Sequence, residues 1–165
     1  MPIDSHTFRQ TVGQFVTGVT VIAIDIGETI RAMTANSFTS LSLDPPLVLF
    51  CIGKDSRAGQ AVHEASGFSV NILADGQQDL SRYFAGVWKD ETPPPFAFVA
   101  WDGGPRLEGS AASLGCDVHA IHEGGDHWIV IGRVIAVHRS DPPARPLVFF
   151  SGAYVELDAA EALAR

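Results

Sequence analysis

The sequence predicts a mainly β fold of one domain, an antiparallel barrel with a few short helices packed around it. Sixteen glycines and ten prolines among 165 residues supply frequent turns. Between the turns lie runs rich in β-branched and aromatic residues, the longest being HWIVIGRVIAVHR at 127–139. A hydrophobic content of 46% with 18% charged residues is typical of a folded chain. Residues 1–165 are therefore expected to form one domain with a single buried core.

The N-terminal elements are predicted to be a helix followed by two strands. Ser5 is the expected N-cap of a helix over residues 5–17, which Gly18 closes. Four apolar side chains share one face of that helix: Phe8, Val12, Phe15 and Val16. After a β-branched strand at 19–25, a turn leads into a second strand at 29–38.

The stretch 31–56 contains the residues that most strongly suggest a ligand-binding site. Small hydrogen-bonding side chains crowd into what reads as a turn between two strands: Thr34, Asn36, Ser37, Thr39, Ser40 and Ser42. Ser56 is the expected N-cap of a short helix near 57–65, and the adjacent Lys54 and Arg57 would help to hold an anion there. The alternative is a plain hairpin with a polar exposed face, followed by a capped helix.

The remaining strands follow one another with short turns between them. They are expected at 47–52, 67–73, 96–101, 110–122, 127–139, 142–150 and 152–157. The strand at 67–73 is expected to be amphipathic. One face carries Phe68, Val70 and Ile72, and the opposite face carries Ser69, Asn71 and Leu73.

Three further segments complete the predicted order. A second helix over 77–86 ends at Gly86. Residues 87–95 contain three consecutive prolines, which forbid regular structure, so this segment is expected to be an exposed flap or a subunit contact. The final residues, 158–165, are expected to be a helical or frayed tail.

Charge and composition exclude several classes of function. The net charge of −8, a pI near 5.0 and the lack of any Lys/Arg run argue against nucleic-acid binding and against an anionic membrane surface. No apolar run is long enough to cross a bilayer, and the opening residues Met1 to Asp4 do not resemble a signal peptide. Cys51 and Cys116 stand alone in apolar runs, which indicates buried free thiols and a cytoplasmic location.

The histidines near the 123–126 turn invite a metal interpretation, but their spacing disfavours it. His119 and His122 are three apart in a strand-like run and point to opposite faces, so no metal is expected. His127 stands at a strand start beside Asp126, where a loop edge can present it to a pocket or leave it as a surface histidine. The sequence also lacks GxSxG, GxGxxG and GxxxxGK[ST] motifs.

Six blocks occur in the same order as in a known family: FVTGVTVI (15–22), MTANSFTSLSLDPPLVLFC (33–51), FSVNIL (68–73), LSRYFAG (80–86), GDHWIVIGRV (125–134) and PLVFFSGAY (146–154). On these blocks the chain resembles the flavin reductase-like, FMN-binding split-barrel family. In particular, it resembles the small reductase components of two-component flavin-dependent monooxygenases. The resemblance spans residues 8–155, nearly the whole chain.

The resemblance implies a Greek-key split β-barrel, usually a homodimer, that binds FMN or FAD. Such a protein reduces the flavin with NADH or NADPH, and the reduced flavin diffuses to a separate oxygenase. Hydride moves directly from the nicotinamide to the flavin, which explains why the sequence shows no obvious acid–base pair.

The resemblance also implies roles for individual residues. Around the isoalloxazine ring the expected contacts are Met33, Thr34, Ala35, Asn36 and Ser37. Along the ribityl chain and phosphate they are Cys51, Lys54, Ser56 and Arg57, with Phe84 near the flavin. His127 and Tyr154 match positions near the nicotinamide, and His127 is the expected catalytic residue, orienting the nicotinamide or donating a proton.

Two departures from the family pattern bear on these roles. Ala32 stands where relatives often have glycine. Ser151 and Ala153 stand where relatives often carry arginines in an RGRY-like motif, of which Tyr154 remains. If those arginines hold the pyridine nucleotide, the preference between NADH and NADPH is open. The second hypothesis is therefore a flavin-binding module that retains FMN without this reductase activity.

Overall fold

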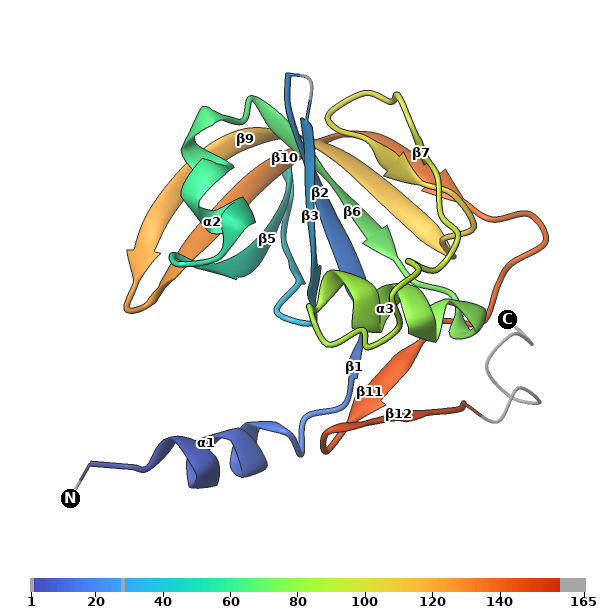
Figure 1. Ribbon diagram of the computed structural model, residues 1–165. Helices are drawn as coiled ribbons and strands as arrows, with labels where there is room; N and C mark the ends of the chain where they lie inside the picture. Colours follow the sequence, from blue (N-terminus) through green and yellow to red (C-terminus); the bar gives the residue numbers. More distant parts are fainter. Residues whose placement is uncertain (1, 28, 158–165) are drawn as a thin grey trace.

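The computed structural model describes residues 2–27 and 29–157. Seven strands form one antiparallel sheet in the order β3-β2-β6-β9-β10-β5-β4 (Figure 1). Their bounds are β2 Thr20–Ile26, β3 Thr29–Ala35, β4 Thr39–Leu43, β5 Pro46–Gly53, β6 Gly67–Ile72, β9 Ala112–Gly124 and β10 His127–Arg139. The predicted mainly β fold is confirmed.

The large sheet curls into a barrel that is split along one side. β3, at one edge of the sheet, lies against β5, but no backbone ladder joins these two strands in the described part of the chain. Ser37, two residues after the end of β3, links this part of the chain to β5 instead. Its Oγ donates to the Cys51 carbonyl and accepts from the Cys51 N–H, at 3.0 Å in each case. One edge of β3 is thus left without a strand partner.

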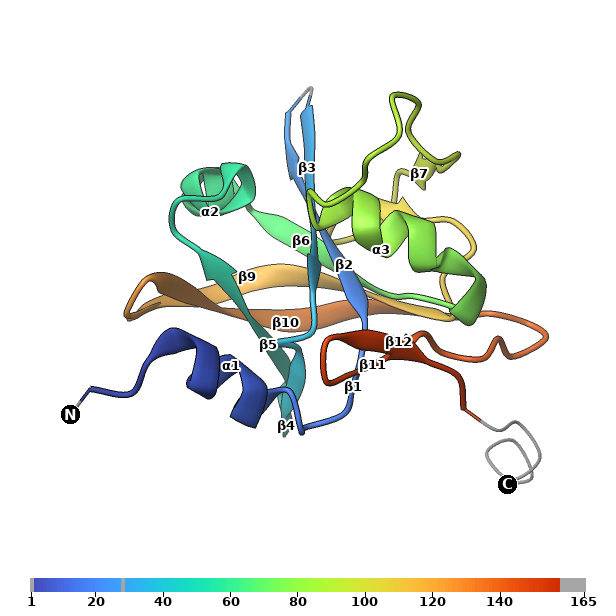
Figure 2. The same ribbon diagram turned by 60° about the horizontal axis from the view of Figure 1, so that its bottom comes forward.

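Short helices and two small sheets surround the barrel. The helices are α1 Ser5–Val12, α2 Arg57–Ala61 and α3 Gln78–Phe84, with 3-10 turns at Val62–Glu64 and Asp75–Gln77. One small sheet joins β1 Thr17–Gly18, β11 Val148–Phe150 and β12 Ala153–Val155, and the other pairs β7 Phe98–Val99 with β8 Arg106–Leu107. Figure 2 shows α2 and α3 flanking β3, and both helices contact it.

The core consists of two apolar clusters. The larger cluster fills the barrel, where the rings of Phe50 and Phe68 meet edge to face with centroids 5.0 Å apart. Gly132 faces this pair, because a Cβ there would lie 2.3 Å from the Phe68 Cζ. The smaller cluster joins the barrel to α3 and to the β1-β11-β12 sheet: Val19, Val21, Leu73, Leu80, Leu107 and Leu147.

β6 is not amphipathic, contrary to the prediction. Ser69 and Asn71, expected on an exposed face, are both fully buried. Pro105 and the strand β8 that follows it cover that face: the Ser69 hydroxyl donates to the Pro105 carbonyl, and the Leu107 N–H donates to Asn71 Oδ1 at 2.9 Å. The polar side chains are therefore buried with hydrogen-bonding partners, and the strand is covered on both faces.

α1 is shorter than the expected helix over 5–17. Asp4, not Ser5, is the N-cap, since Asp4 Oδ1 accepts from the N–H groups of His6 and Thr7 at 3.0 Å each. The helix ends at Val12 with Gly13 as its C-cap, so the expected apolar face extending to Val16 does not form on one helix. α1 has no buried residue and projects away from the barrel (Figures 1 and 2).

Other predicted boundaries also shift. The strand expected at 29–38 ends at Ala35, and Thr39–Leu43 forms an edge strand paired with β5 where a turn was expected. Hydroxyl side chains on an edge strand resemble a turn in composition because much of the strand faces water. Within the strand expected at 96–101, only Phe98–Val99 pairs. The tail expected at 158–165 lies outside the described residues.

The segment 87–95 has neither helix nor strand, as predicted from its prolines. The Trp88 Nε1–H donates to the Thr92 carbonyl at 3.0 Å, which closes the segment into a loop. The helix before it, expected over 77–86, spans Gln78–Phe84 with Ala85 as its C-cap, and Gly86 follows at φ +74°, a conformation that favours glycine.

Candidate functional site

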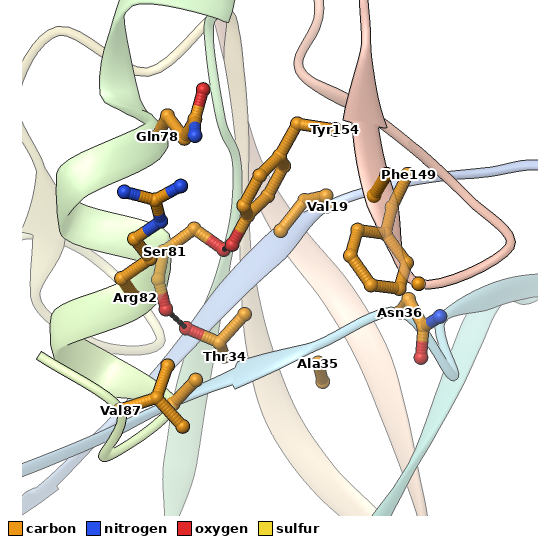
Figure 3. A pocket seen from close by; sticks show the side chains of 13 residues that line it. Val19, Thr34, Ala35, Asn36, Gln78, Ser81, Arg82, Val87, Phe149 and Tyr154 are labelled. Carbon is orange, nitrogen blue, oxygen red and sulfur yellow. Dashed lines mark hydrogen bonds between the residues drawn. The ribbon is translucent and has the colours of Figure 1, made fainter.

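A cleft of about 680 Å³ lies between α3 and the β11–β12 hairpin, and we call it the hairpin cleft. The end of β3 forms its base, through Thr34, Ala35 and Asn36 (Figure 3). α3 contributes Gln78, Ser81 and Arg82, and the hairpin sheet contributes Phe149 and Tyr154. Its walls thus combine an aromatic pair with amide, hydroxyl and guanidinium groups.

Hydrogen bonds fix the polar side of the hairpin cleft. Thr34 Oγ1 donates to the Ser81 carbonyl at 2.7 Å, and the Ser81 and Tyr154 hydroxyls share a hydrogen bond of 2.8 Å. The Arg82 guanidinium carbon lies 5.7 Å from the centre of the Tyr154 ring, and Phe149 meets the same ring edge to face at 5.3 Å. Tyr154 is therefore held by contacts on several sides.

A second cleft, of about 860 Å³, adjoins the first, and we call it the arginine cleft. Both clefts are lined by Ala85 at the end of α3. β3 contributes Arg31 and Met33 to the arginine cleft, while α2 contributes Arg57. An aromatic wall completes it: Tyr83, Phe84, Phe96 and Phe98.

The two clefts together are cationic in a protein that is acidic overall. Arg31, Arg57 and Arg82 line them, and no carboxylate side chain of residues 2–27 or 29–157 does, although the chain has a net charge of −8. Within the described residues, none of these three guanidinium groups has a carboxylate partner. Unneutralised cations gathered along one groove provide a local field that favours an anionic ligand.

Ser56 fixes the start of α2 beside the arginine cleft. Its Oγ accepts from the Gly59 N–H at 2.9 Å, as predicted for an N-cap, and donates to the Gly53 carbonyl at 2.8 Å. Gly59 permits this close packing, because a Cβ there would lie 2.0 Å from the Gly53 oxygen. Arg57 is thereby held at the edge of the cleft.

Lys54 lies outside both clefts. Its Nζ is 3.3 Å from Glu123 Oε1 and 4.4 Å from the centre of the Trp128 ring. The pair of basic side chains predicted around Ser56 is therefore divided, with Arg57 facing the cleft and Lys54 facing the β9–β10 hairpin. Lys54 remains close to His127 through the backbone, since its N–H donates to the Asp126 carbonyl at 3.0 Å.

His127 lines neither cleft. It begins β10 opposite Gly53, and its Nδ1 lies 2.7 Å from Asp126 Oδ1. That hydrogen bond, followed by the nearby charge of His127, lowers the pKa of the Asp126 carboxyl. His127 and Tyr154, which the sequence suggests for one ligand, line no common cleft in the described chain.

The remaining predicted site residues divide among these places. Thr34, Ala35, Asn36 and Tyr154 line the hairpin cleft, whereas Met33, Ser56, Arg57 and Phe84 line the arginine cleft. Ser37 and Cys51 form the bridge between β3 and β5. Cys51 is half-buried and Cys116 is buried, and both are free thiols.

Several lining residues were not predicted from the sequence. Gln78, Ser81 and Arg82 come from α3, and Phe149 comes from β11. The LSRYFAG and PLVFFSGAY blocks contain three of these four residues and could have pointed to them. Their roles require knowing that α3 lies against the hairpin, which the sequence pattern does not indicate.

Two further observations bear on the class of site. In residues 2–27 and 29–157, no group of three or more His, Cys, Asp or Glu side chains could hold a metal ion. No helix there is long and apolar enough to span a membrane.

The flavin reductase-like domain family matches residues 12–158, and the chain belongs to that family. The chain is 41% identical over 163 residues to the reductase subunit HsaB of a flavin-dependent monooxygenase from Mycobacterium tuberculosis, covering 94% of this chain and 84% of that protein. It is 43% identical over 160 residues to an NADH-dependent FAD reductase of Streptomyces globisporus, covering 92% and 84%.

Solved structures agree with this family membership. An NADH:FAD oxidoreductase of Streptomyces globisporus, in complex with NAD and FAD fragments, superimposes with a TM-score of 0.86. The identity is 37%, over 96% of this chain and 95% of that one. The resemblance stated from the six sequence blocks is confirmed, and with it the split-barrel fold.

Proposed function

We propose that this chain is an NAD(P)H:flavin oxidoreductase that supplies reduced flavin to a separate monooxygenase. One observation carries the proposal beyond family membership: among the residues that the structure describes, the two adjoining clefts present three arginines without carboxylate partners, and no carboxylate lines them. Flavin phosphates and pyridine nucleotides are anions attached to flat rings. The clefts combine cationic and aromatic groups as such ligands require.

The flavin ring is assigned to residues 33–37 and its phosphate end to Arg57. The base of the hairpin cleft at Thr34 to Asn36 offers backbone and side-chain hydrogen-bonding groups for a heterocycle, and Arg57 lies beyond them in the arginine cleft. Met33, Ser56 and Phe84, which line the arginine cleft, would border the same ligand. Ser37 and Cys51 would border it at the bridge between β3 and β5.

When both are bound, the nicotinamide supplies a hydride and the flavin accepts it, so the chain needs to align two rings more than to move protons. Thr34, Ser81 and Tyr154, linked by hydrogen bonds of 2.7 and 2.8 Å, would hold one wall of that arrangement. Arg82 would stabilise negative charge within reach of the hairpin cleft. The roles predicted for His127 toward the nicotinamide and for Lys54 toward the flavin phosphate stay predictions outside this arrangement, because neither side chain lines either cleft.

A homodimer is part of the proposal. Large apolar side chains of the N-terminal segment are exposed to water, which is unfavourable for apolar surface. Ile3 and Phe15 are both 76% exposed, Phe8 58%, and Val12 and Val16 both 53%. Exposed apolar side chains gathered in one segment favour an interaction surface, and a second copy would cover them. Sedimentation equilibrium tests this, with Phe8→Ser and Phe15→Ser together expected to shift a dimer to monomer. A wild-type monomer at micromolar concentration would refute it.

The oxygenase is assigned no docking surface, because transfer by free diffusion of reduced flavin needs none. A cytoplasmic location is proposed from the two free cysteines.

Anaerobic stopped-flow absorbance tests the reductase. The flavin band is followed after mixing enzyme with FMN or FAD and with NADH or NADPH. Rapid bleaching with flavin in excess over enzyme is the expected result. The fastest combination identifies the preferred flavin and the preferred pyridine nucleotide.

A flavin-binding module is the second candidate, since Ser151 and Ala153 bring no cation to the hairpin. Saturable flavin binding without bleaching by either nucleotide would favour that candidate and refute the reductase.

A further inference from the structure

We infer that Gly13 is a positioning residue for the hairpin cleft, because its contact with Ser151 holds the turn of the β11–β12 hairpin, which forms one wall of the cleft. The inference rests on the proposed function and adds a residue outside the cleft to that site. Three observations carry it: where the hairpin is anchored, what lies against its turn, and why glycine occupies position 13.

The strands of the hairpin are anchored to the body of the protein. Leu147, just before β11, is buried, and its N–H donates to the Leu73 carbonyl at 2.8 Å. On β12, the Tyr154 hydroxyl shares a 2.8 Å hydrogen bond with Ser81 of α3. Both contacts hold the strands, and the turn at residues 151–152 lies beyond them.

The turn itself is exposed, although it borders the cleft. Ser151 and Gly152 are exposed to water, and Gly152 lines the hairpin cleft together with Ala153. Ser151 adopts φ +48°, a left-handed conformation that is unfavourable for a residue other than glycine. A turn of this kind keeps one shape when neighbouring groups hold it.

The N-terminal segment supplies a group that holds this turn. The Ser151 N–H donates to the Gly13 carbonyl at 2.9 Å. Figures 1 and 2 show the turn beside the segment that follows α1. That segment continues into β1, which pairs with β11 so that Thr17 lies opposite Phe149. The N-terminal segment therefore contacts the hairpin both at its turn and along its first strand.

Glycine at position 13 gives the turn room. Gly13 has φ −61°, a right-handed conformation open to any residue, so the backbone does not require glycine here. A Cβ on Gly13 would lie 3.6 Å from the Ser151 Cα, an ordinary contact, and 3.1 Å from the Arg9 carbonyl oxygen. A side chain with atoms beyond that Cβ would compete with the turn for space.

Holding the turn prepares the cleft for its ligand. The hairpin sheet contributes Phe149, Gly152, Ala153 and Tyr154 to the wall of the cleft of about 680 Å³. A wall that is already in place does not have to be ordered when the ligand binds, which lowers the free-energy cost of binding. We therefore expect the affinity for the pyridine nucleotide, whose ring the resemblance places near Tyr154, to depend on Gly13.

Three variants separate this role from a general effect on folding. Gly13→Ile adds side-chain atoms beyond Cβ at the contact with Ser151. Gln14→Ile is the matched control, because Gln14 is the next residue, is exposed and receives the same side chain. Gly13→Ala is the conservative variant. It shares the 3.1 Å contact of Cβ with the Arg9 oxygen but adds nothing beyond Cβ.

Hydrogen–deuterium exchange measured by mass spectrometry reports on the turn directly, without turnover. In Gly13→Ile, the peptide that contains Ser151 is expected to exchange about fivefold faster than in wild type, the effect of losing one hydrogen bond. The strand β5, Pro46–Gly53, is the internal reference and is expected to exchange as in wild type. Gln14→Ile and Gly13→Ala are expected to match wild type in both peptides.

Steady-state kinetics then tests the cleft. With the preferred flavin saturating, Gly13→Ile is expected to raise KM for NADH about fivefold at nearly unchanged kcat, because the wall contributes equally to binding in the ground and transition states. Gly13→Ala is expected to restore the wild-type KM.

The inference is refuted if Gly13→Ile and Gln14→Ile give the same exchange at the turn, or the same KM for NADH. Faster exchange of the turn and β5 together would also refute it, because the whole domain would then have loosened. If wild type oxidises no NADH with FMN or FAD, the proposed function fails, while the exchange comparison still decides whether Gly13 holds the turn.

Discussion

Replacing Asn71 by alanine is expected to cost about 4 kcal/mol of unfolding free energy, roughly a third of the stability of an ordinary domain. The side chain is fully buried on β6 and uses all of its hydrogen-bonding capacity. Its Nδ2 donates to the Val21 carbonyl at 3.1 Å and to Ser69 Oγ at 2.8 Å. Its Oδ1 accepts from the Leu107 N–H and from Ser113 Oγ, at 2.9 Å each.

The magnitude follows from what alanine leaves behind. Two buried donors, the Leu107 N–H and the Ser113 hydroxyl, lose this acceptor. Each buried donor left unsatisfied costs about 1–3 kcal/mol, so two of them give about 4 kcal/mol. For a domain of this size the expected fall in melting temperature is about 8–16 °C.

Urea denaturation followed by circular dichroism measures the change, with Asn36→Ala as the control. Asn36 is exposed and lines the hairpin cleft, so its loss is expected to change stability by less than about 0.5 kcal/mol. A loss below about 1 kcal/mol for Asn71→Ala would show that water or a local shift satisfies the stranded donors, and the reasoning would fail.

The other predictions concern the thiols, one carboxyl and one hydroxyl. Burial raises the pKa of Cys51 and, with the Asp117 charge, raises that of Cys116 to about 12. At pH 8, Ellman's reagent should therefore modify Cys51 slowly and Cys116 only after unfolding, and fast labelling of both in the native protein would contradict this. The pKa of Asp126 is lowered, so its favourable contact persists above about pH 4 and is lost as pH falls below its depressed pKa. His127→Gln should return that pKa toward its ordinary value in a carboxyl ¹³C titration, and an unchanged titration would exclude the contact. Tyr154→Phe should lower kcat/KM for the pyridine nucleotide about 2- to 10-fold in steady-state assays, and no change would remove Tyr154 from the site.

The sequence predicted the fold and the Ser56 cap better than it predicted the burial of individual strands. Blocks of residues in a fixed order identified the barrel, and the Ser56 cap could be read from local spacing alone. The burial of Ser69 and Asn71 could not be read in this way, because the residues that cover them follow more than 30 positions later: the bonds to Pro105 and Leu107 each span 36 positions.

The same limit applies to the site. Arg31, Arg57 and Arg82 are isolated in sequence and become a cationic groove only when α2 and α3 flank β3. Lys54 and Arg57 are three residues apart and suggested one basic seat, but Glu123 and Trp128 hold Lys54 elsewhere. Local spacing predicts caps and turns. It does not show that a side chain distant in sequence, such as Glu123, pairs with a lysine and holds it away from the predicted site.

β3 sets the spacing of the ligand because one strand contributes to both clefts. From Arg31 to Ala35 there are four residue steps, or about 13 Å at the usual rise of a strand. An insertion of one residue there would lengthen the separation by about 3.3 Å. The strand therefore fixes the distance between the ring and phosphate positions, and changes in ligand preference are expected to arise from substitutions in α3 and in the proline-rich loop, which line the clefts from other elements.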